Sequence, residues 1–209
     1  MPIASRTGLQ VKTALDLWRN EEKMKSLDID QLSQGLPTIT PIFCRMLVES
    51  AVFCLEYNRH VSKNCILDGH DGLNEKFDLA WNSPDSRVLN TYGDLQEVTE
   101  YGATGIAILL TVTNTKYSTV SRAFKAHGFD YWVGDKDADT GVFQEKARLE
   151  ISGILSGSEA TFRQRIKQKT SQTDKSDSMG TDCYISVVEF GDPKASLLQK
   201  HKKAVGHGK

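Results

Sequence analysis

The sequence lacks most of the features that assign a chain quickly to a well-known class. No apolar run approaches the ~20 residues that a membrane-spanning helix requires. The four cysteines form no C-x-x-C pair, and no histidine stands at zinc-finger spacing from them, which disfavours a structural zinc site. No G-x-G-x-x-G, P-loop or G-x-S-x-G motif occurs, which disfavours nucleotide-cofactor enzymes and serine hydrolases.

An excess of one charge sign is also missing. The chain carries 26 Lys and Arg against 27 Asp and Glu, a formal net charge of -1. It therefore has no global attraction to nucleic acid or anionic membranes, and any nucleic-acid contact must come from a local basic patch. Residues 1–10 show no charged region followed by an apolar core, so no secretory signal is expected. Cys44 and Cys54 fall in an apolar helical run as small hydrophobes, and reduced thiols favour a cytoplasmic location.

The first 90 residues contain the less regular patterns. Residues 11–27 predict a polar amphipathic helix, and residues 28–40 a linker. Pro41 suits the first position of an apolar helix, and residues 65–67 and 77–81 are short strand candidates. We expect this region to extend the sheet or to form a dimer or recognition surface.

The second half is better punctuated. Asp94 followed by Glu97 predicts a helix start, and strand patterns follow at 117–124, 129–133 and 147–155. A helix at 159–172 and an apolar strand at 183–190 complete the order α-β-β-β-α-β. This order predicts an α/β (α+β) fold with a mixed central sheet flanked by helices. The expected organisation is an N-terminal helical extension over 1–90, a core over 91–195 and a basic flexible tail over 196–209.

Two of the predicted strands each carry one carboxylate. Asp130 and Glu150 stand in otherwise sheet-forming company, where an acidic side chain is costly unless something pairs with it. The two runs can pair as a hairpin and bring both carboxylates to one sheet edge. A hard divalent ion, Mg²⁺ or Mn²⁺, suits such oxygen ligands. The simpler alternatives are bonds to a neighbouring turn, to Arg148, or to a lysine or arginine across the sheet.

The element order and these carboxylates resemble the PD-(D/E)XK nuclease-like superfamily. The resemblance covers roughly residues 94–190 and implies a restriction-endonuclease-like core. Asp130 matches the Asp position of the motif, and Glu150 matches the first residue of the (D/E)XK element. Glu100 fits the acidic residue that the family often carries on its first helix. The resemblance implies that Glu100, Asp130 and Glu150 are metal ligands.

The chain departs from the family pattern at Ser152, where the motif lysine is expected. In the family that lysine helps activate the attacking water and stabilises charge in the transition state. Serine can donate a hydrogen bond but supplies no positive charge. Lys146 shares the strand face but lies about 13 Å from Glu150 along the strand. The following helix offers alternatives, which are Gln164, Lys167 and Gln168.

The same helix carries a basic run. Its members, which could follow a phosphate backbone or simply face solvent, are Arg163, Arg165, Lys167 and Lys169. The acidic segment 135–141 lacks the glycine and glutamate of a calcium loop and predicts a hairpin turn. Two glycines in the helix that starts at Asp94, Gly102 and Gly105, suggest close packing on a sheet.

We therefore expect a metal-dependent nuclease-like protein that acts on a nucleic-acid phosphodiester. Asp130, Glu150, Ser152 and Lys167 would be its catalytic residues. The first alternative is a catalytically inactive binding module on the same fold. The second is a structural subunit of a larger complex, using Trp18 and the surface of residues 43–55. A homodimer or other homo-oligomer is possible, and no membrane partner is expected.

Overall fold

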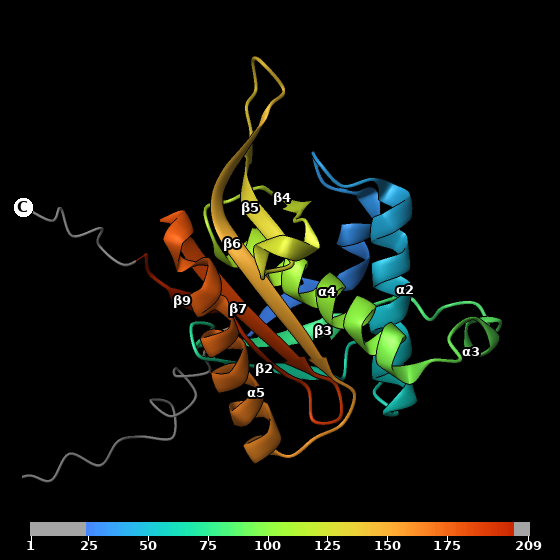
Figure 1. Ribbon diagram of the computed structural model, residues 1–209. Coiled ribbons are helices and arrows are strands. Elements are labelled where there is room, and N and C mark those ends of the chain that lie inside the picture. The colour runs from blue at the N-terminus through green and yellow to red at the C-terminus, as the bar shows by residue number, and fades with distance from the viewer. Residues whose placement is uncertain (1–23, 203–209) are drawn as a thin grey trace, which may run out of the picture.

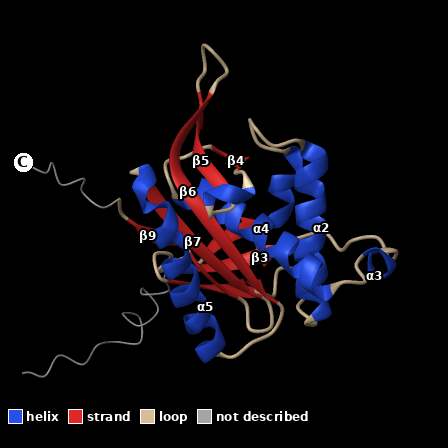
Figure 2. Cartoon of the chain, in the orientation of Figure 1, coloured by secondary structure: helices blue, strands red, loops and turns tan. Residues whose placement is uncertain are grey.

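A mixed nine-stranded sheet forms the centre of the part of the chain that the computed structural model describes, residues 24–202 (Figures 1 and 2). The strands are β1 (Lys25–Asp28), β2 (Ile66–His70), β3 (Lys76–Ala80), β4 (Thr119–Arg122), β5 (Tyr131–Lys136), β6 (Phe143–Ile154), β7 (Asp182–Glu189), β8 (Lys194–Ser196) and β9 (Leu198–Lys200). The α-helices are α2 (Pro41–Tyr57), α3 (Val88–Thr91), α4 (Leu95–Asn114) and α5 (Glu159–Gln172). The 3-10 helices are η1 (Ile29–Gln34), η2 (Lys125–His127) and η3 (Thr173–Met179).

The sheet combines the two halves of the chain. Its order is β1-β3-β2-β8-β7-β6-β5-β4, and β9 pairs with β7 beside β8. β6 and β7 are parallel, as are β1 with β3 and β2 with β8, and the other pairs are antiparallel. The expected mixed sheet flanked by helices is therefore confirmed. Its N-terminal strands extend one edge of the sheet.

Helices cover both faces of β6. A Cβ added at Gly153 would lie 2.6 Å from the Thr99 carbonyl oxygen of α4, so Gly153 faces α4. The adjacent Ser152 bonds to Arg165 of α5. Since neighbouring strand residues point to opposite faces, α4 and α5 lie on opposite sides of the sheet.

The main core lies between the sheet and the α2–α4 pair. Gly102 and Gly105 allow α4 to approach α2, because an added Cβ would lie 2.9 Å from the Ser50 carbonyl oxygen and 3.0 Å from that of Leu47. The expectation that these glycines pack against a sheet is therefore wrong. Asp94 caps α4 as expected, with its Oδ1 accepting from the N–H groups of Gln96 and Glu97.

A smaller apolar cluster holds α5 to the opposite face. Phe162 and Ile166 of the helix pack with Ile154 and Val187 of the sheet. Ser158 accepts a hydrogen bond from the Thr161 N–H at 3.2 Å and starts the helix. The bounds of α5 agree with the predicted helix.

The cysteines belong to the interior. All four are free and buried. Burial raises the pKa of Cys54 to about 12 and the pKa values of Cys65 and Cys183 to about 11. These three thiols therefore stay protonated at neutral pH, as expected of small buried hydrophobes.

The hairpin of β5 and β6 extends beyond the rest of the sheet, at the top of Figure 1. At its tip, Asp137 Oδ1 accepts hydrogen bonds from the N–H groups of Asp139 and Thr140 and from the Thr140 hydroxyl. These bonds make the acidic segment a hairpin turn, as predicted.

Several expectations for the ends of the chain need correction. The helix predicted over 11–27 lies mostly outside the described residues, and its last three residues belong to β1. The predicted linker over 28–40 contains η1, where Ile29 and Leu32 are buried because they pack into the main core. The expected tail over 196–209 begins with sheet residues, since Ser196 ends β8 and Leu198–Lys200 forms β9.

Helix α2 is largely an interior element. Cys44, Leu47, Ala51 and Cys54 are fully buried because α2 packs on α4 and η1. Most of the 43–55 segment is therefore not an exposed docking surface, and Trp18 lies outside the described residues. No helix within residues 24–202 combines the length and apolar character needed to cross a membrane.

Candidate active site

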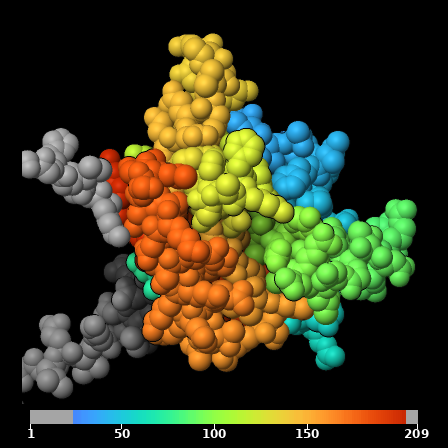
Figure 3. Space-filling model, in the orientation of Figure 1, coloured from blue at the N-terminus to red at the C-terminus, as the bar shows by residue number. Residues whose placement is uncertain are grey.

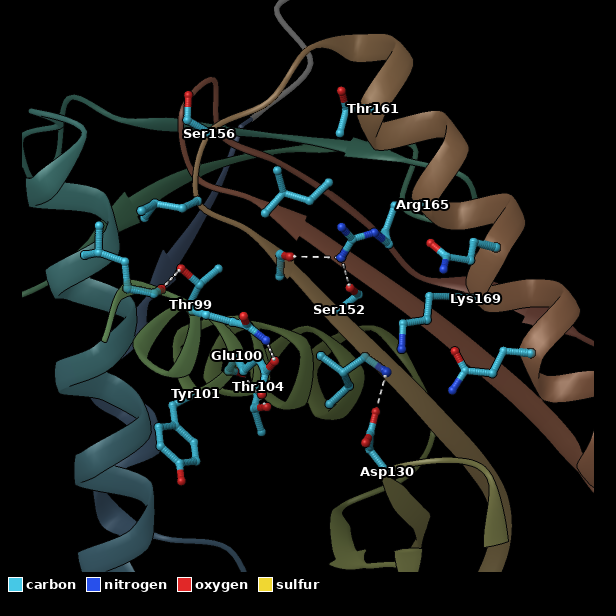
Figure 4. Close-up of a pocket in the computed structure, with 18 of the residues that line it drawn as sticks. Thr99, Glu100, Tyr101, Thr104, Asp130, Ser152, Ser156, Thr161, Arg165 and Lys169 are labelled. Carbon is cyan, nitrogen blue, oxygen red and sulfur yellow. Dashed lines mark hydrogen bonds between the residues drawn. The ribbon is translucent and has the colours of Figure 1, made fainter. Parts of the chain in front are cut away.

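A cleft opens where β6 runs past the end of its neighbour β5. Tyr131, the first residue of β5, pairs with Leu149, so β6 continues from Glu150 to Ile154 beyond the start of β5. The cleft has a volume of about 870 Å³, and its walls come from α4, this edge of β6, and α5 (Figure 4). Ligand sites are typically concave and carry a few convergent polar groups, as this cleft does.

Asp130 lies directly before the first residue of β5, at the border of the cleft. Its N–H donates to the Leu149 carbonyl at 3.1 Å, which holds Asp130 beside β6. Its Oδ2 accepts from the Ile151 N–H at 2.9 Å, as Figure 4 shows. The carboxylate thus caps a backbone donor at the open edge of β6 and borders the cleft.

Glu150 is buried and paired with a lysine from the helix above it. Its side chain is 2% exposed, and its Oε1 lies 2.7 Å from Lys169 Nζ. Burial raises the pKa of the Glu150 carboxyl, and the negative charge of Asp130 raises it further, while Lys169 partly offsets both effects. The two carboxylates therefore interact electrostatically across adjacent strands, as an acidic pair does.

Ser152 lies two residues further along the same strand face. Its Oγ accepts a hydrogen bond from Arg165 Nη1 at 2.7 Å, and the same nitrogen lies 3.4 Å from the Gly153 carbonyl oxygen. The serine that replaces the expected motif lysine thus holds a guanidinium from α5. The cleft contains a fixed positive charge despite the serine.

Glu100 lines the cleft from the α4 side. Its Oε1 accepts from Gln96 Nε2 at 3.2 Å, one helical turn earlier. Within residues 24–202, no three Asp, Glu, His or Cys side chains are grouped so that they could hold a metal ion. The charge of Asp130 acts on Glu150, whereas Glu100 does not join these two carboxylates in a group of three within the described residues.

The basic run of α5 divides between two helix faces. Arg165 and Lys169, four residues apart, both line the cleft. Arg163 instead pairs with Glu159 at 2.6 Å with 70% of its side chain exposed. Lys167 is exposed and is not among the residues that line the cleft. Residues four apart share a helix face while those two apart do not. The four basic residues, which occupy every second position of α5 from Arg163 to Lys169, therefore lie alternately on the cleft face and on the solvent face.

Arg148 does not pair with either carboxylate. It is 1% exposed and donates to the Ser176 hydroxyl at 2.6 Å and to the Thr181 carbonyl at 2.7 Å. An ion pair with Asp177 at 3.5 Å completes its surroundings. The considered alternative, in which Arg148 neutralises Asp130 or Glu150, is therefore wrong.

Sequence reasoning missed two features of the site. Arg122 lines the cleft, and its Nη1 donates to the Tyr131 hydroxyl at 2.9 Å from above the ring. Lys169 was assigned to nucleic-acid binding and not to Glu150. A signal for Lys169 existed, because it follows the buried Phe162 by seven residues, or two helical turns.

Comparisons with protein-family models, curated proteins and solved structures give no match for this chain. The resemblance to the PD-(D/E)XK nuclease-like superfamily therefore gains no support from relatives. Any functional conclusion depends on the geometry of the cleft itself.

Proposed function

We propose that this protein is a divalent-metal-dependent nuclease-like enzyme that cleaves a nucleic-acid phosphodiester in the cleft beside β6. The carrying observation is the contact of 2.7 Å between Lys169 Nζ and Glu150 Oε1. In the resembled family a lysine two residues after the glutamate supplies positive charge. Here Ser152 occupies that position, and α5 supplies the charge from the side through Lys169.

The donor set suits a hard divalent ion. Within residues 24–202, Asp130 Oδ1 and Glu150 Oε2 accept no hydrogen bond, whereas the other oxygen of each carboxylate does. Mg²⁺ is commonly held by one or two carboxylates together with waters and substrate phosphates, so three protein ligands are not required. Asp130 and Glu150 are the residues that would hold it. A bound ion there would polarise the phosphodiester and lower the pKa of an attacking water.

The side chains around this pair support the same chemistry. Arg165 and Lys169 place two cations beside two carboxylates, in a cleft open enough for a phosphodiester. Fixed cations stabilise the charge that develops on phosphate oxygens during transfer, and they need no reorganisation to do so. Ser152 positions Arg165. Lys169, by its contact with Glu150, is held where it can meet the substrate phosphate.

A catalytically inactive binding module is the second candidate. The same ion pair favours it, because Lys169 already neutralises Glu150 and thereby weakens the pull of the site on a metal ion. In that case Arg165, Lys169 and Arg122 would bind a phosphate backbone without cleaving it.

The test compares two lysine variants that differ in helix face. Wild type, Asp130→Asn, Lys169→Met and Lys167→Met are incubated with single- and double-stranded DNA and RNA, with Mg²⁺ or Mn²⁺ and with an EDTA control. We expect wild-type cleavage only with metal, no cleavage by Asp130→Asn, and a loss of about 100-fold for Lys169→Met, typical of a removed electrostatic stabiliser. Lys167→Met, the matched control, should retain wild-type activity.

Three outcomes would contradict the proposal. Equal activity of the two lysine variants would remove Lys169 from the reaction. Nucleic-acid binding without cleavage under every metal condition would establish the binding module instead. A complete lack of binding would favour the structural-subunit alternative.

The remaining parts of the proposal concern setting and assembly. The buried reduced thiols suit a cytoplasmic location. A homodimer remains a proposal that sedimentation can test, and its interface would not be the buried face of α2.

A further inference from the structure

The short loop between β4 and β5 lies beside the cleft and carries an exposed aromatic ring. The Ala123 N–H donates to the Asp130 carbonyl at 2.9 Å, so the loop closes on the candidate metal ligand itself. Phe124 directly follows Ala123. In Figure 3 the yellow surface around residue 125 lies between the surfaces of α5 and α4, on the face that is shown.

Phe124 is presented to solvent on a base of other rings. It is 78% exposed, the highest exposure among the large hydrophobic residues of the described part of the chain. It contacts His127 edge to face at 5.6 Å, and His127 stacks on Phe129 at 5.7 Å. Phe129 is 5% exposed and packs edge to face on Trp132 at 4.7 Å. Of these supporting rings Phe129 is buried and His127 and Trp132 are half-buried, while most of Phe124 remains uncovered.

The charged residues next to this ring in the loop are basic. Arg122 and Lys125 flank Phe124, and residues 122–129 contain no Asp or Glu before Asp130 closes the loop. Arg122 also lines the cleft. An exposed ring next to cations is the combination with which proteins bind single-stranded nucleic acid, because bases stack on the ring and phosphates meet the cations. A purely apolar partner would gain nothing from these charges.

We propose that Phe124 is a stacking residue for an unpaired base next to the phosphate in the cleft, which makes single-stranded nucleic acid the substrate class. This inference rests on the proposed function for the position of the phosphate. A base within a duplex is stacked on its neighbours and presents no free face to Phe124. The ring thus selects strands whose bases are unpaired.

The test measures binding separately from cleavage. Fluorescein-labelled single-stranded DNA, single-stranded RNA and duplex DNA are titrated with protein in Ca²⁺ and in EDTA, and anisotropy is followed. We expect Phe124→Ala to lose about 5-fold to 150-fold in affinity for single strands, the range for one stacked base, with little change for duplex. Phe124→Trp should retain binding. Leu89→Ala, which removes another exposed apolar side chain (71%) outside the cleft lining, is the matched control and should bind as wild type does.

A spectroscopic arm reports stacking directly. An oligonucleotide that contains 2-aminopurine should lose fluorescence on binding wild type and Phe124→Trp, and not on binding Phe124→Ala. Circular dichroism of each variant verifies folding. We expect the Phe124 variants to fold as wild type does, because the side chain is exposed.

Other results would overturn the inference. They are unchanged single-strand affinity in Phe124→Ala, an equal loss on duplex, or a loss of self-association in sedimentation with unchanged nucleic-acid binding. Failure of the proposed function looks different: Phe124-dependent binding of single strands without cleavage in any metal leaves the stacking residue in place. Cleavage that Phe124→Ala does not alter leaves the enzyme in place and removes the stacking residue.

Discussion

Replacing Lys169 with methionine should destabilise the protein more than the same replacement at Lys167, the other lysine of α5. Methionine keeps the length of the side chain but leaves Glu150, 2% exposed, without its 2.7 Å partner. Removing one partner of a buried ion pair costs about 3 to 5 kcal/mol. Lys169 is 20% exposed, so water can replace part of its contact, and we expect about 3 kcal/mol at neutral pH.

This loss should depend on pH because Glu150 can take up a proton. Its pKa is already raised in the folded state, and removing Lys169 raises it further. Below the ordinary carboxyl pKa, Glu150 is neutral in folded and unfolded chains, and the variant no longer buries an unpaired charge. The difference in unfolding free energy between wild type and Lys169→Met should therefore be larger at pH 7 than at pH 4.

Urea unfolding at the two pH values measures this difference. Lys167→Met is the control, and as a surface change it should stay within about 0.5 kcal/mol of wild type. In a double-mutant cycle with Glu150→Gln, the two substitutions should be clearly non-additive. Additive losses, or a Lys169→Met loss that is the same at pH 4 and pH 7, would refute the reasoning.

Three further predictions concern the surroundings of the site. Arg148→Met should lower the free energy of unfolding by about 3 kcal/mol, since it removes a buried cation held by Ser176 and the Thr181 carbonyl. Limited proteolysis should then show faster cleavage within η3, and an unchanged digestion pattern would argue against this role. Gly102→Ala should lower the melting temperature despite a helix-propensity gain of about 1 kcal/mol, because its Cβ would meet a carbonyl of α2 at 2.9 Å. The control is Gly93→Ala, whose Cβ would meet no atom within 4 Å, and it should leave the melting temperature unchanged. In wild type the pKa of Glu150 is raised in the folded state, so between the ordinary and the raised pKa the folded state binds more protons than the unfolded state. The contribution of Glu150 to the free energy of unfolding therefore falls as pH rises through that window. Urea unfolding of wild type and Glu150→Gln at a series of pH values should show this decrease only in wild type.

Local pattern was sufficient to predict most elements of the second half. Ser158 followed by a helical pattern places α5 correctly, because a capping side chain satisfies the first N–H groups locally. The alternation around Glu150 likewise predicts β6, which faces the main core on one side and α5 on the other. These signals need no knowledge of distant contacts.

The first half was harder because its structure depends on partners far away in sequence. β1 is only four residues long and exists through parallel pairing with β3, so its own sequence resembles the end of a polar helix. Ser196 and the residues of β9 look like the start of a polar tail, yet they pair with strands that precede them. Propensity cannot detect such pairing.

The candidate site was half visible from sequence. Asp130 and Glu150 were found because a carboxylate in a strand is costly. The choice of lysine was wrong in emphasis: Lys167 is exposed outside the cleft, and Lys169 bonds to Glu150. Which face of α5 meets β6 is decided by the packing of Phe162 and Ile166, and a dense basic run hides that periodicity.

The central claim is that Asp130 and Glu150 bind one divalent ion beside Lys169. Its most direct test is a crystal of the protein soaked with Mn²⁺ and measured for anomalous scattering. The account predicts one anomalous peak in contact with carboxylate oxygens of both residues, and its disappearance in Asp130→Asn. No peak at these carboxylates at saturating Mn²⁺, with Lys169 still bonded to Glu150, would contradict it.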